Sequence, residues 1–132
     1  MVSAETIRKM DLWFSRIVRY RAASKGGFSQ CFTCSTIDSV VRMDCGHYID
    51  REWLNTRFDF NNCRVQCRKC NRHLDGNIKR FSVLLGNYIG KEEVIQLQER
   101  SKEPWDMTER EAKELITKWR AECRQLRKDK NF

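Results

Sequence analysis

The sequence is poor in residues that interrupt or rigidify a chain: only one of its 132 residues is proline, six are glycine and two are histidine. No stretch approaches the roughly 18–20 consecutive apolar residues that a membrane-spanning helix needs, so no membrane partner is expected. The first residues contain no apolar signal region, and the seven cysteines are an odd number, which disfavours the paired disulfides of a secreted protein. We therefore expect a cytoplasmic protein with reduced thiols.

Acidic residues are scarce near the N-terminus. The formal net charge is +8 at pH 7, and the excess is greatest in residues 1–27, which contain six basic and two acidic residues. Such a charge favours a polyanionic partner, and for residues 8–25 we favour nucleic acid. Residues 91–132 alternate in sign, and there a solvated surface explains the charges equally well.

Apolar residues at intervals of three and four predict helices over residues 4–23, 78–89 and 91–101, and from Thr108 to about Lys128, the last opened by a capping box of Thr108 and Glu111. Between them, residues 36–39 predict a turn, 40–43 a short strand running into Asp44 and His47, 50–61 an irregular connection, and 63–66 a second strand. The predicted class is α+β and mostly helical. At this length we expect a single domain, with a basic amphipathic helix (1–27), a core (28–90) and C-terminal helices (91–132).

Two Cys-x-x-Cys pairs stand 32 residues apart in the central segment, and these are Cys31 with Cys34 and Cys67 with Cys70. Each pair places two thiolates on one side of a tight bend, and two such bends make a tetrahedral structural zinc site. Cys45 or Cys63 could replace one ligand, but neither has a partner at this spacing, so we interpret both as small core residues near the site. Cys123 lies on an apolar helix stripe and is also expected in the core.

Three motifs follow one another in the central segment: Asp44-Cys-Gly-His47, Arg57-Phe-Asp-Phe-Asn-Asn62 and Gln66-Cys-Arg-Lys-Cys-Asn71-Arg-His-Leu-Asp-Gly-Asn77. Together they resemble the lambdoid phage recombination proteins called NinG or Rap, and the resemblance runs from about residue 28 to the C-terminus. Members of that family are HNH-type endonucleases, with a ββα-metal (His-Me finger) core, that resolve branched DNA. The resemblance therefore implies a zinc-stapled ββα core over residues 28–90, in a phage- or prophage-encoded protein that acts in the bacterial host cell.

The resemblance also implies roles for individual residues. Neutral His47 would take a proton from the water that attacks the scissile phosphorus, and Asn62 would orient the His47 ring through a backbone contact. Asn71 and Asp44 would bind a catalytic Mg²⁺ or Mn²⁺ beside the scissile phosphate. Asp50, or phosphate and water, could take the place of Asp44. Without the resemblance, a lone histidine such as His47 is more often structural.

Basic side chains crowd the same block, and we assign to DNA backbone contacts Arg51, Arg57, Arg68, Lys69 and Arg72, together with His73 and Asn77. His73 and Asn77 could instead cap the following helix. Branched DNA such as Holliday junctions and D-loops is the implied substrate. An HNH nuclease of the homing or restriction type would act on ordinary duplex instead, and a zinc module that only binds nucleic acid is the alternative outside the enzymes.

One HNH site cuts one strand, whereas resolving a four-way junction requires two nicks. We therefore expect a C2 homodimer, which matches the two-fold symmetry of the junction. The candidate interfaces are residues 7–18 or the α-helical stripe of Leu115, Ile116, Trp119 and Leu126. The same apolar stripes could equally cover the core of a monomer.

Overall fold

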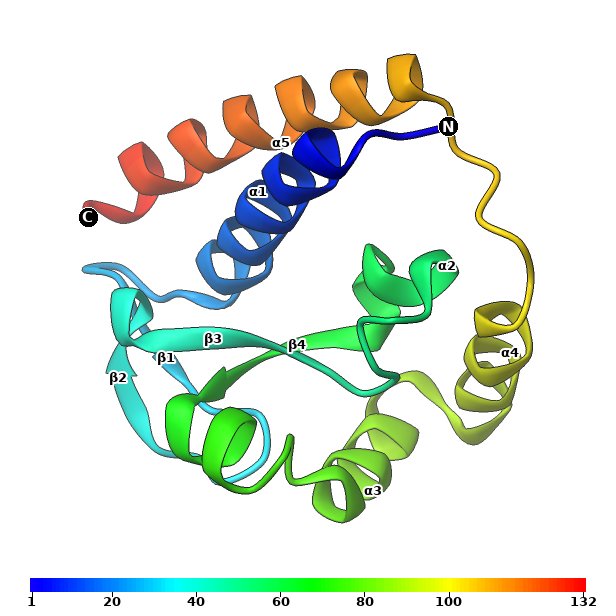
Figure 1. Cartoon of the computed structure of the whole chain (residues 1–132). Coiled ribbons are helices and arrows are strands. Elements are labelled where there is room, and N and C mark those ends of the chain that lie inside the picture. The colour runs from blue at the N-terminus through cyan, green and yellow to red at the C-terminus, as the bar shows by residue number, and fades with distance from the viewer.

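The computed structural model describes all 132 residues as a mostly helical α+β fold with two small antiparallel sheets (Figure 1). The helices and strands are, in chain order, α1 (Ala4–Ala22), β1 (Phe28–Gln30), β2 (Ile37–Ser39), β3 (Met43–His47), α2 (Leu54–Arg57), β4 (Cys63–Cys67), α3 (Ile78–Ile89), α4 (Lys91–Ser101) and α5 (Glu109–Lys130). Short helical turns lie between them at η1 (Val40–Arg42), η2 (Phe60–Asn62) and η3 (Lys69–His73). The predicted fold class is confirmed at this level. No helix combines the length and the apolar character that crossing a bilayer requires.

Helices α1 and α5 pack against each other along their apolar stripes, at the edge of the molecule that holds both termini (Figure 1). Met10 and Phe14 of α1 and Trp119 of α5 are buried in this contact, which forms the largest apolar cluster of the protein. Helix α5 begins at the predicted capping box of Thr108 and Glu111. The two stripes that were candidate dimer interfaces therefore cover each other within one chain.

Strands β3 and β4 form an antiparallel pair against α1, with Met43 opposite Cys67 and His47 opposite Cys63. The predicted position of the first strand, residues 40–43, is wrong: residues 40–42 form η1, and β3 begins at Met43. The Ser39 hydroxyl accepts a hydrogen bond from the Val41 amide and caps this turn. Such local hydrogen bonding gives the backbone an alternative to a strand.

The turn predicted at residues 36–39 is also corrected, because β2 occupies Ile37–Ser39 and pairs with β1. Strands of three residues are too short for an alternating pattern to be recognised in the sequence. The Cys31 amide donates to the Thr36 carbonyl at 2.8 Å and closes the loop between the two strands. This hairpin presents the first two cysteines of the predicted zinc site.

The segment after β4 reverses the chain in two stages. The single π-helical turn η3 ends at His73, and then Asp75, Gly76 and Asn77 adopt left-handed φ angles of 48°, 87° and 49° before α3 begins. Helices α3 and α4 pack together through a small cluster of their own, and Gly90, at φ 93°, separates them as the sequence predicts. The irregular connection predicted over residues 50–61 contains the single turn α2 and the start of η2.

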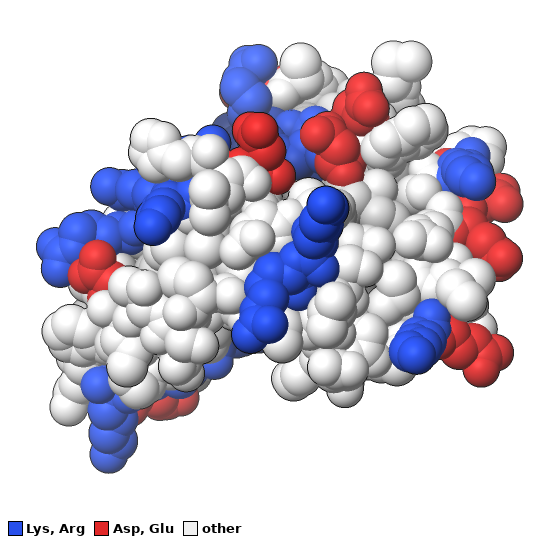
Figure 2. Space-filling view, turned by 90° about the horizontal axis from the view of Figure 1, so that it is seen from below, with Lys and Arg blue, Asp and Glu red and all other residues white.

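Charge is distributed unevenly over the surface. In the view from below, Lys and Arg predominate toward the side of β1 and β2, whereas more Asp and Glu lie toward the side of α4 (Figure 2). Much of the surface between them is uncharged. The more basic surface is therefore on the side of the β1–β2 hairpin, whose loop contains Cys31 and Cys34.

Candidate functional site

The four predicted zinc ligands converge at one point. Their Sγ atoms all lie within 4.8 Å of one another, and those of Cys34 and Cys67 are 3.6 Å apart. A tetrahedral zinc site with Zn–S bonds of about 2.3 Å places its sulfurs about 3.8 Å apart. Cys45 and Cys63 are not part of this group. The donor set and its spacing therefore fit a metal such as zinc, and the ligands Cys31, Cys34, Cys67 and Cys70 are the ones the sequence predicts.

Neighbouring polar groups already face these sulfurs. The Thr33 hydroxyl lies 3.4 Å from Cys31 Sγ, the Cys70 amide donates to Cys67 Sγ at 3.4 Å, and the Asn77 side-chain amide donates to Cys70 Sγ at 3.7 Å. Burial raises the pKa of Cys67 to about 12, whereas in Cys31 hydrogen bonds from Thr33 and nearby backbone outweigh burial and lower the pKa to about 6. Thiolates this close repel one another, so ionising all four requires a bound cation.

His47 stands at the end of β3 with one ring nitrogen held by the backbone. Its Nε2 lies 2.9 Å from the carbonyl oxygen of Arg57. Because a carbonyl oxygen only accepts hydrogen bonds, we assign the ring proton to Nε2, which leaves a lone pair on Nδ1. Burial lowers the pKa of His47 below 6.5, against the opposing effect of the Arg57 carbonyl. The ring is therefore neutral at pH 7 and can accept a proton at Nδ1.

Asn62 is fully buried and fixes the connection that carries the Arg57 carbonyl. Its Oδ1 accepts from the Ile49 amide at 2.7 Å, and its Nδ2 donates to the carbonyls of Ile49 and Thr56, each at 3.0 Å. Asn62 makes no hydrogen bond to the His47 ring. It holds the backbone on both sides of the loop after β3, and so acts on His47 through Arg57.

Asp44 and Asn71 meet as the resemblance implies, but a third side chain joins them. The Asn71 Nδ2 donates to Asp44 Oδ2 at 3.0 Å, while Arg72 donates to both oxygens of the same carboxylate, at 2.9 Å each. If the Asn71 side-chain amide were rotated by half a turn, its oxygen would lie beside the Asp44 carboxylate. An amide oxygen and a carboxylate oxygen are ligands that suit a hard divalent cation. Asp44 and Asn71 thus carry the kinds of donor that such a cation uses, but Arg72 occupies both oxygens of Asp44 in this structure.

The packing of Gln66 explains why the residue directly before His47, Gly46, is a glycine. A Cβ at Gly46 would lie 1.9 Å from Gln66 Oε1. Gln66 is fully buried and donates from Nε2 to Thr33 Oγ1 at 3.0 Å and to the Gly76 carbonyl at 2.9 Å. Gln66 therefore ties β4, the strand paired with that of His47, to the cysteine hairpin and to the turn before α3.

Cys45, His47 and Cys63 form a second group, with ligand atoms within 4.8 Å of one another. Burial raises the pKa of Cys63 well above its ordinary value, so this thiol stays uncharged. Cys63 belongs to the apolar cluster under α1, and Cys45 packs against it. Cys63 is thus a small core residue next to the site, as the sequence predicts, and Cys123 is buried in the same cluster. Cys45 is only partly buried and also lines the cleft of His47.

Five of the predicted site residues, together with Cys45, line one cleft of about 500 Å³, whose other wall is α1. His47, Asp44, Asn71, Arg72 and Arg51 come from the central segment. The residues that α1 contributes are Arg8, Asp11, Leu12, Phe14, Ser15 and Arg19. Sequence reasoning gave α1 a possible role in binding phosphates but did not place it in the site. The signal available was its run of basic residues, which does not show where the helix packs.

The residues predicted to contact DNA differ in their exposure and in their hydrogen-bond partners. Arg57 is paired with Asp11 through two hydrogen bonds, one of 2.9 Å and one of 2.5 Å, and its side chain is only 19% exposed. Arg51 reaches the same carboxylate at 3.0 Å but is more than half exposed. Arg68, Lys69, Arg72 and His73 are exposed, whereas Asn77 faces a cysteine sulfur. Arg57 thus serves as a structural tie between α1 and the loop after β3.

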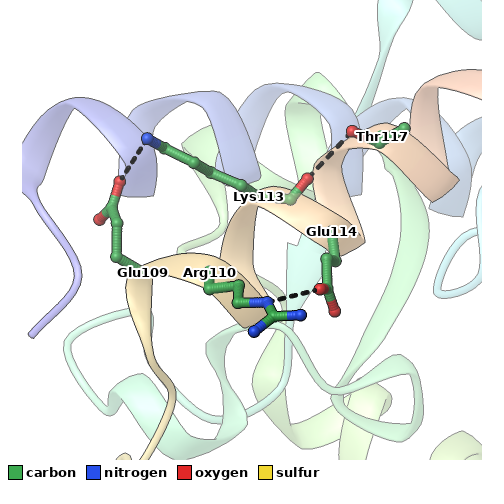
Figure 3. A pocket seen from close by; sticks show the side chains of 5 residues that line it. All are labelled: Glu109, Arg110, Lys113, Glu114 and Thr117. Atoms are coloured by element: carbon green, nitrogen blue, oxygen red, sulfur yellow. Dashed lines mark hydrogen bonds and ion pairs between the residues drawn. The ribbon is translucent and has the colours of Figure 1, made fainter.

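A shallow hollow on the outer face of α5 contains only charged side chains that neutralise one another, and one threonine (Figure 3). Its charged side chains are paired with one another, Lys113 with Glu109 at 3.6 Å and Arg110 with Glu114 at 3.2 Å. It has no histidine or cysteine, and no charge without a partner. This hollow is a solvated helix surface and not a candidate site.

Comparison with known proteins identifies the family of this chain. The family model described as "Bacteriophage Lambda NinG protein" matches residues 4–129 and so includes α1, beyond the range of the motif resemblance. The protein is similar to Protein ninG of Escherichia phage 933W (31% identical; 76% of this chain, 50% of that protein) and of Salmonella phage P22 (30%; 74% and 47%). It is also similar to Protein ninG of Escherichia phage lambda (29%; 76% and 49%), so the chain spans about half the length of these relatives. No solved structure matches. The chain belongs to the NinG family of bacteriophage proteins.

Proposed function

We propose that this protein is a metal-dependent DNA endonuclease of the HNH (ββα-metal) type, acting on branched recombination intermediates such as Holliday junctions and D-loops. One observation carries the proposal: a neutral histidine with a free Nδ1 shares a cleft with a paired Asp44 and Asn71 and with several arginines. The order β3, β4 and then the η3–α3 segment is that of a ββα unit. The relatives' name, Protein ninG, supports the family and leaves the activity to experiment.

His47 is the proposed general base. With Nε2–H held by the Arg57 carbonyl, Nδ1 accepts the proton of a water molecule as the oxygen of that water attacks the phosphorus. Asn62 keeps the loop in place, so the ring does not have to be ordered when substrate binds. Arg51 and Arg72, both exposed at the cleft, hold nonbridging phosphate oxygens.

Asp44 and Asn71 are the proposed holders of a divalent ion. When bound, Mg²⁺ or Mn²⁺ supplies the positive charge that stabilises the pentacovalent phosphate and the leaving 3' oxygen. Arg72 has a double role in this scheme, because it covers the Asp44 carboxylate in the free protein and is released toward the phosphate of the substrate. Zinc at the four cysteines is structural and ties the β1–β2 hairpin to β4 and η3.

The test uses a labelled four-way junction and a matched linear duplex, each with or without added Mg²⁺. We expect the wild-type protein to cut the junction in Mg²⁺ only, leaving 5'-phosphate ends. His47→Ala should abolish cleavage while junction binding persists. Asn71→Ala should be rescued in part by raising Mg²⁺. Wild-type cleavage by His47→Ala would overturn the assignment.

A non-catalytic zinc module that binds nucleic acid is the second candidate, and the Arg72–Asp44 pair favours it. That pair satisfies the carboxylate that a metal would use. The same assay separates the two functions, because a binding module holds the junction with no cut in Mg²⁺ or Mn²⁺. Efficient cutting of the linear duplex alone would instead indicate a nuclease of the homing or restriction type.

Paired nicks require two copies of this site, and we propose a C2 homodimer on the junction. Since the stripes of α1 and α5 cover each other, the interface must use other surfaces. Light scattering of the protein alone and with junction tests this arrangement. A monomer in both states that still makes paired nicks would exclude it.

A further inference from the structure

Helix α1 separates two basic grooves. On one side lies the cleft of His47, and on the other α1 and α5 enclose a groove of about 340 Å³. From α1, Trp13, Arg16 and Tyr20 line this second groove, and they are spaced three and four residues apart on one helix face. Arg120, Arg124 and Arg127 line it from α5 at the same spacing. We refer to these six residues as the arginine groove.

The arginine groove has a concentration of positive charge that the protein does not compensate. Arg16, Arg120 and Arg124 have no carboxylate within 4.0 Å, and Arg127 Nε donates to the main-chain oxygen of Phe132 at 3.1 Å. In contrast, Arg21 and Arg110, elsewhere on the same two helices, pair with Glu122 and Glu114. Guanidinium groups brought together without carboxylates repel one another. Such an arrangement is stabilised by a bound polyanion, and it attracts one over a distance of several ångströms.

Trp13 fixes two of these guanidinium groups. The Arg16 guanidinium carbon lies 4.6 Å from the centre of the Trp13 ring and that of Arg120 lies 5.4 Å from it. Stacking on an aromatic face leaves the N–H groups at the edge of the guanidinium free to bind an anion. A planar pair of N–H donors matches the oxygens of a phosphate, so these two side chains are already oriented for phosphodiester groups.

The length of the groove fits a run of DNA backbone. From Arg120 to Arg127 the helix rises about 10 Å, which corresponds to about three base-pair steps of a strand. A single phosphate or nucleotide would leave some of the arginines without a partner. The α5 surface beyond the groove, near Glu109 and Glu114, carries compensated charge and offers no continuation.

We infer that the arginine groove binds the phosphate backbone of a second DNA arm, while the cleft of His47 holds the arm that is cut. This inference rests on the proposed function and adds a basis for its substrate preference. A branched molecule occupies both grooves at once, with α1 between its arms. A linear duplex that occupies the cleft leaves the arginine groove empty.

The experiment measures equilibrium binding by fluorescence anisotropy without added Mg²⁺ or Mn²⁺ and without a chelator, so that cleavage does not contribute and the structural zinc is kept. The variant Arg120→Glu/Arg124→Glu is compared with wild type on a four-way junction and on a linear duplex of the same arm sequence. We expect junction affinity to fall by about tenfold or more, and the slope of log K against log salt to fall by about two, as for the loss of two phosphate contacts. Duplex affinity should change by less than about threefold.

Two controls keep the result interpretable. Lys118→Glu makes a charge reversal of the same sign on an exposed position of α5 outside the groove, and it should leave both affinities unchanged. Arg120→Gln/Arg124→Gln removes the charges without adding acids, and thermal denaturation checks that each variant is folded. Unchanged junction binding by the folded double variants, or an equal loss for junction and duplex, would overturn the inference. Binding that depends on the groove in a protein that never cuts DNA would refute only the nuclease proposal.

Discussion

Replacing Asn62 with alanine tests the structural account of the site most directly. The Asn62 amide has no solvent exposure and makes three hydrogen bonds, with the Ile49 amide, the Ile49 carbonyl and the Thr56 carbonyl. Alanine removes all three and leaves those backbone groups without partners in a buried place. Asn61→Ala is the matched control, because the side-chain amide of Asn61, the residue before Asn62, is partly exposed and makes one hydrogen bond, to Glu93.

The magnitude follows from these contacts. Each net hydrogen bond contributes about 1 kcal/mol, and buried groups left unsatisfied add to the loss, so Asn62→Ala should lower the free energy of unfolding by about 3–5 kcal/mol. Asn61→Ala should cost about 1 kcal/mol or less. With an unfolding entropy of about 2 cal/mol/K per residue, a chain of this size loses about 4 °C in Tm per kcal/mol, so the two variants should differ by about 10–15 °C.

Calorimetry or thermal circular dichroism, at a fixed zinc concentration, provides the measurement. Below its own Tm, the Asn62→Ala protein should also cut the junction more slowly, because the loop that carries the Arg57 carbonyl no longer holds Nε2 of His47. Zinc content should stay at one ion per chain, since Asn62 touches no cysteine of that site. A Tm within about 4 °C of the Asn61→Ala value, which corresponds to about 1 kcal/mol, would refute the claim that Asn62 holds the loop.

Four further outcomes are expected. Cys67→Ser should lose the zinc and unfold the domain, because such sites contribute about 10–16 kcal/mol of apparent binding energy. Elemental analysis should still find one zinc in the control Cys123→Ser. A folded, active and zinc-free wild type would contradict this. Burial lowers the pKa of His47 below 6.5, so the cleavage rate should be flat above pH 6.5 and fall only as the pH drops through that lowered pKa. Any stability that His47 contributes should be lost over the same pH range, because the unfolded state takes up the proton first. A rate that keeps rising well above pH 7 would argue against His47 as the base. Gly46→Ala should cost about 1–3 kcal/mol in denaturant unfolding because its Cβ meets Gln66, and an additive Gly46→Ala/Gln66→Ala double variant would show that this clash is not the cause. Arg72→Ala should bind Mg²⁺ more tightly by calorimetry, because Arg72 occupies both oxygens of Asp44; unchanged Mg²⁺ affinity would place the ion elsewhere.

Local interactions made much of this protein predictable from its sequence. The bounds of α1, α3, α4 and α5 follow from apolar spacing and caps, since helix energetics depend on residues within one or two turns. The four cysteines that could hold a metal such as zinc follow from Cys-x-x-Cys spacing, because a tight bend fixes two thiolates with no help from the rest of the chain. The motif order placed His47, Asp44 and Asn71 as candidates, and the fold brings them into one cleft.

Contacts between distant residues were not predictable in this way. The β1–β2 hairpin has strands too short to show a period, and Ser39 converts the expected start of β3 into a helical turn. The pairing of Arg57 with Asp11 joins residues 46 positions apart, and it turns an expected DNA contact into a structural tie. Such pairs depend on which surfaces of the protein come into contact, and the composition and spacing of the residues do not show which surfaces these are.

The sequence by itself thus predicted the helices and the four cysteines of the cluster that could hold a metal, and it named His47 as the candidate base. Only the tertiary structure decided which nitrogen of His47 is free, that α1 walls the cleft, that Arg72 covers Asp44, and that four arginines from two helices share one groove. The physical reason is the range of the forces involved. Helix and turn preferences act over a few residues, whereas burial, hydrogen bonding and charge at a site arise where segments far apart in the chain pack together.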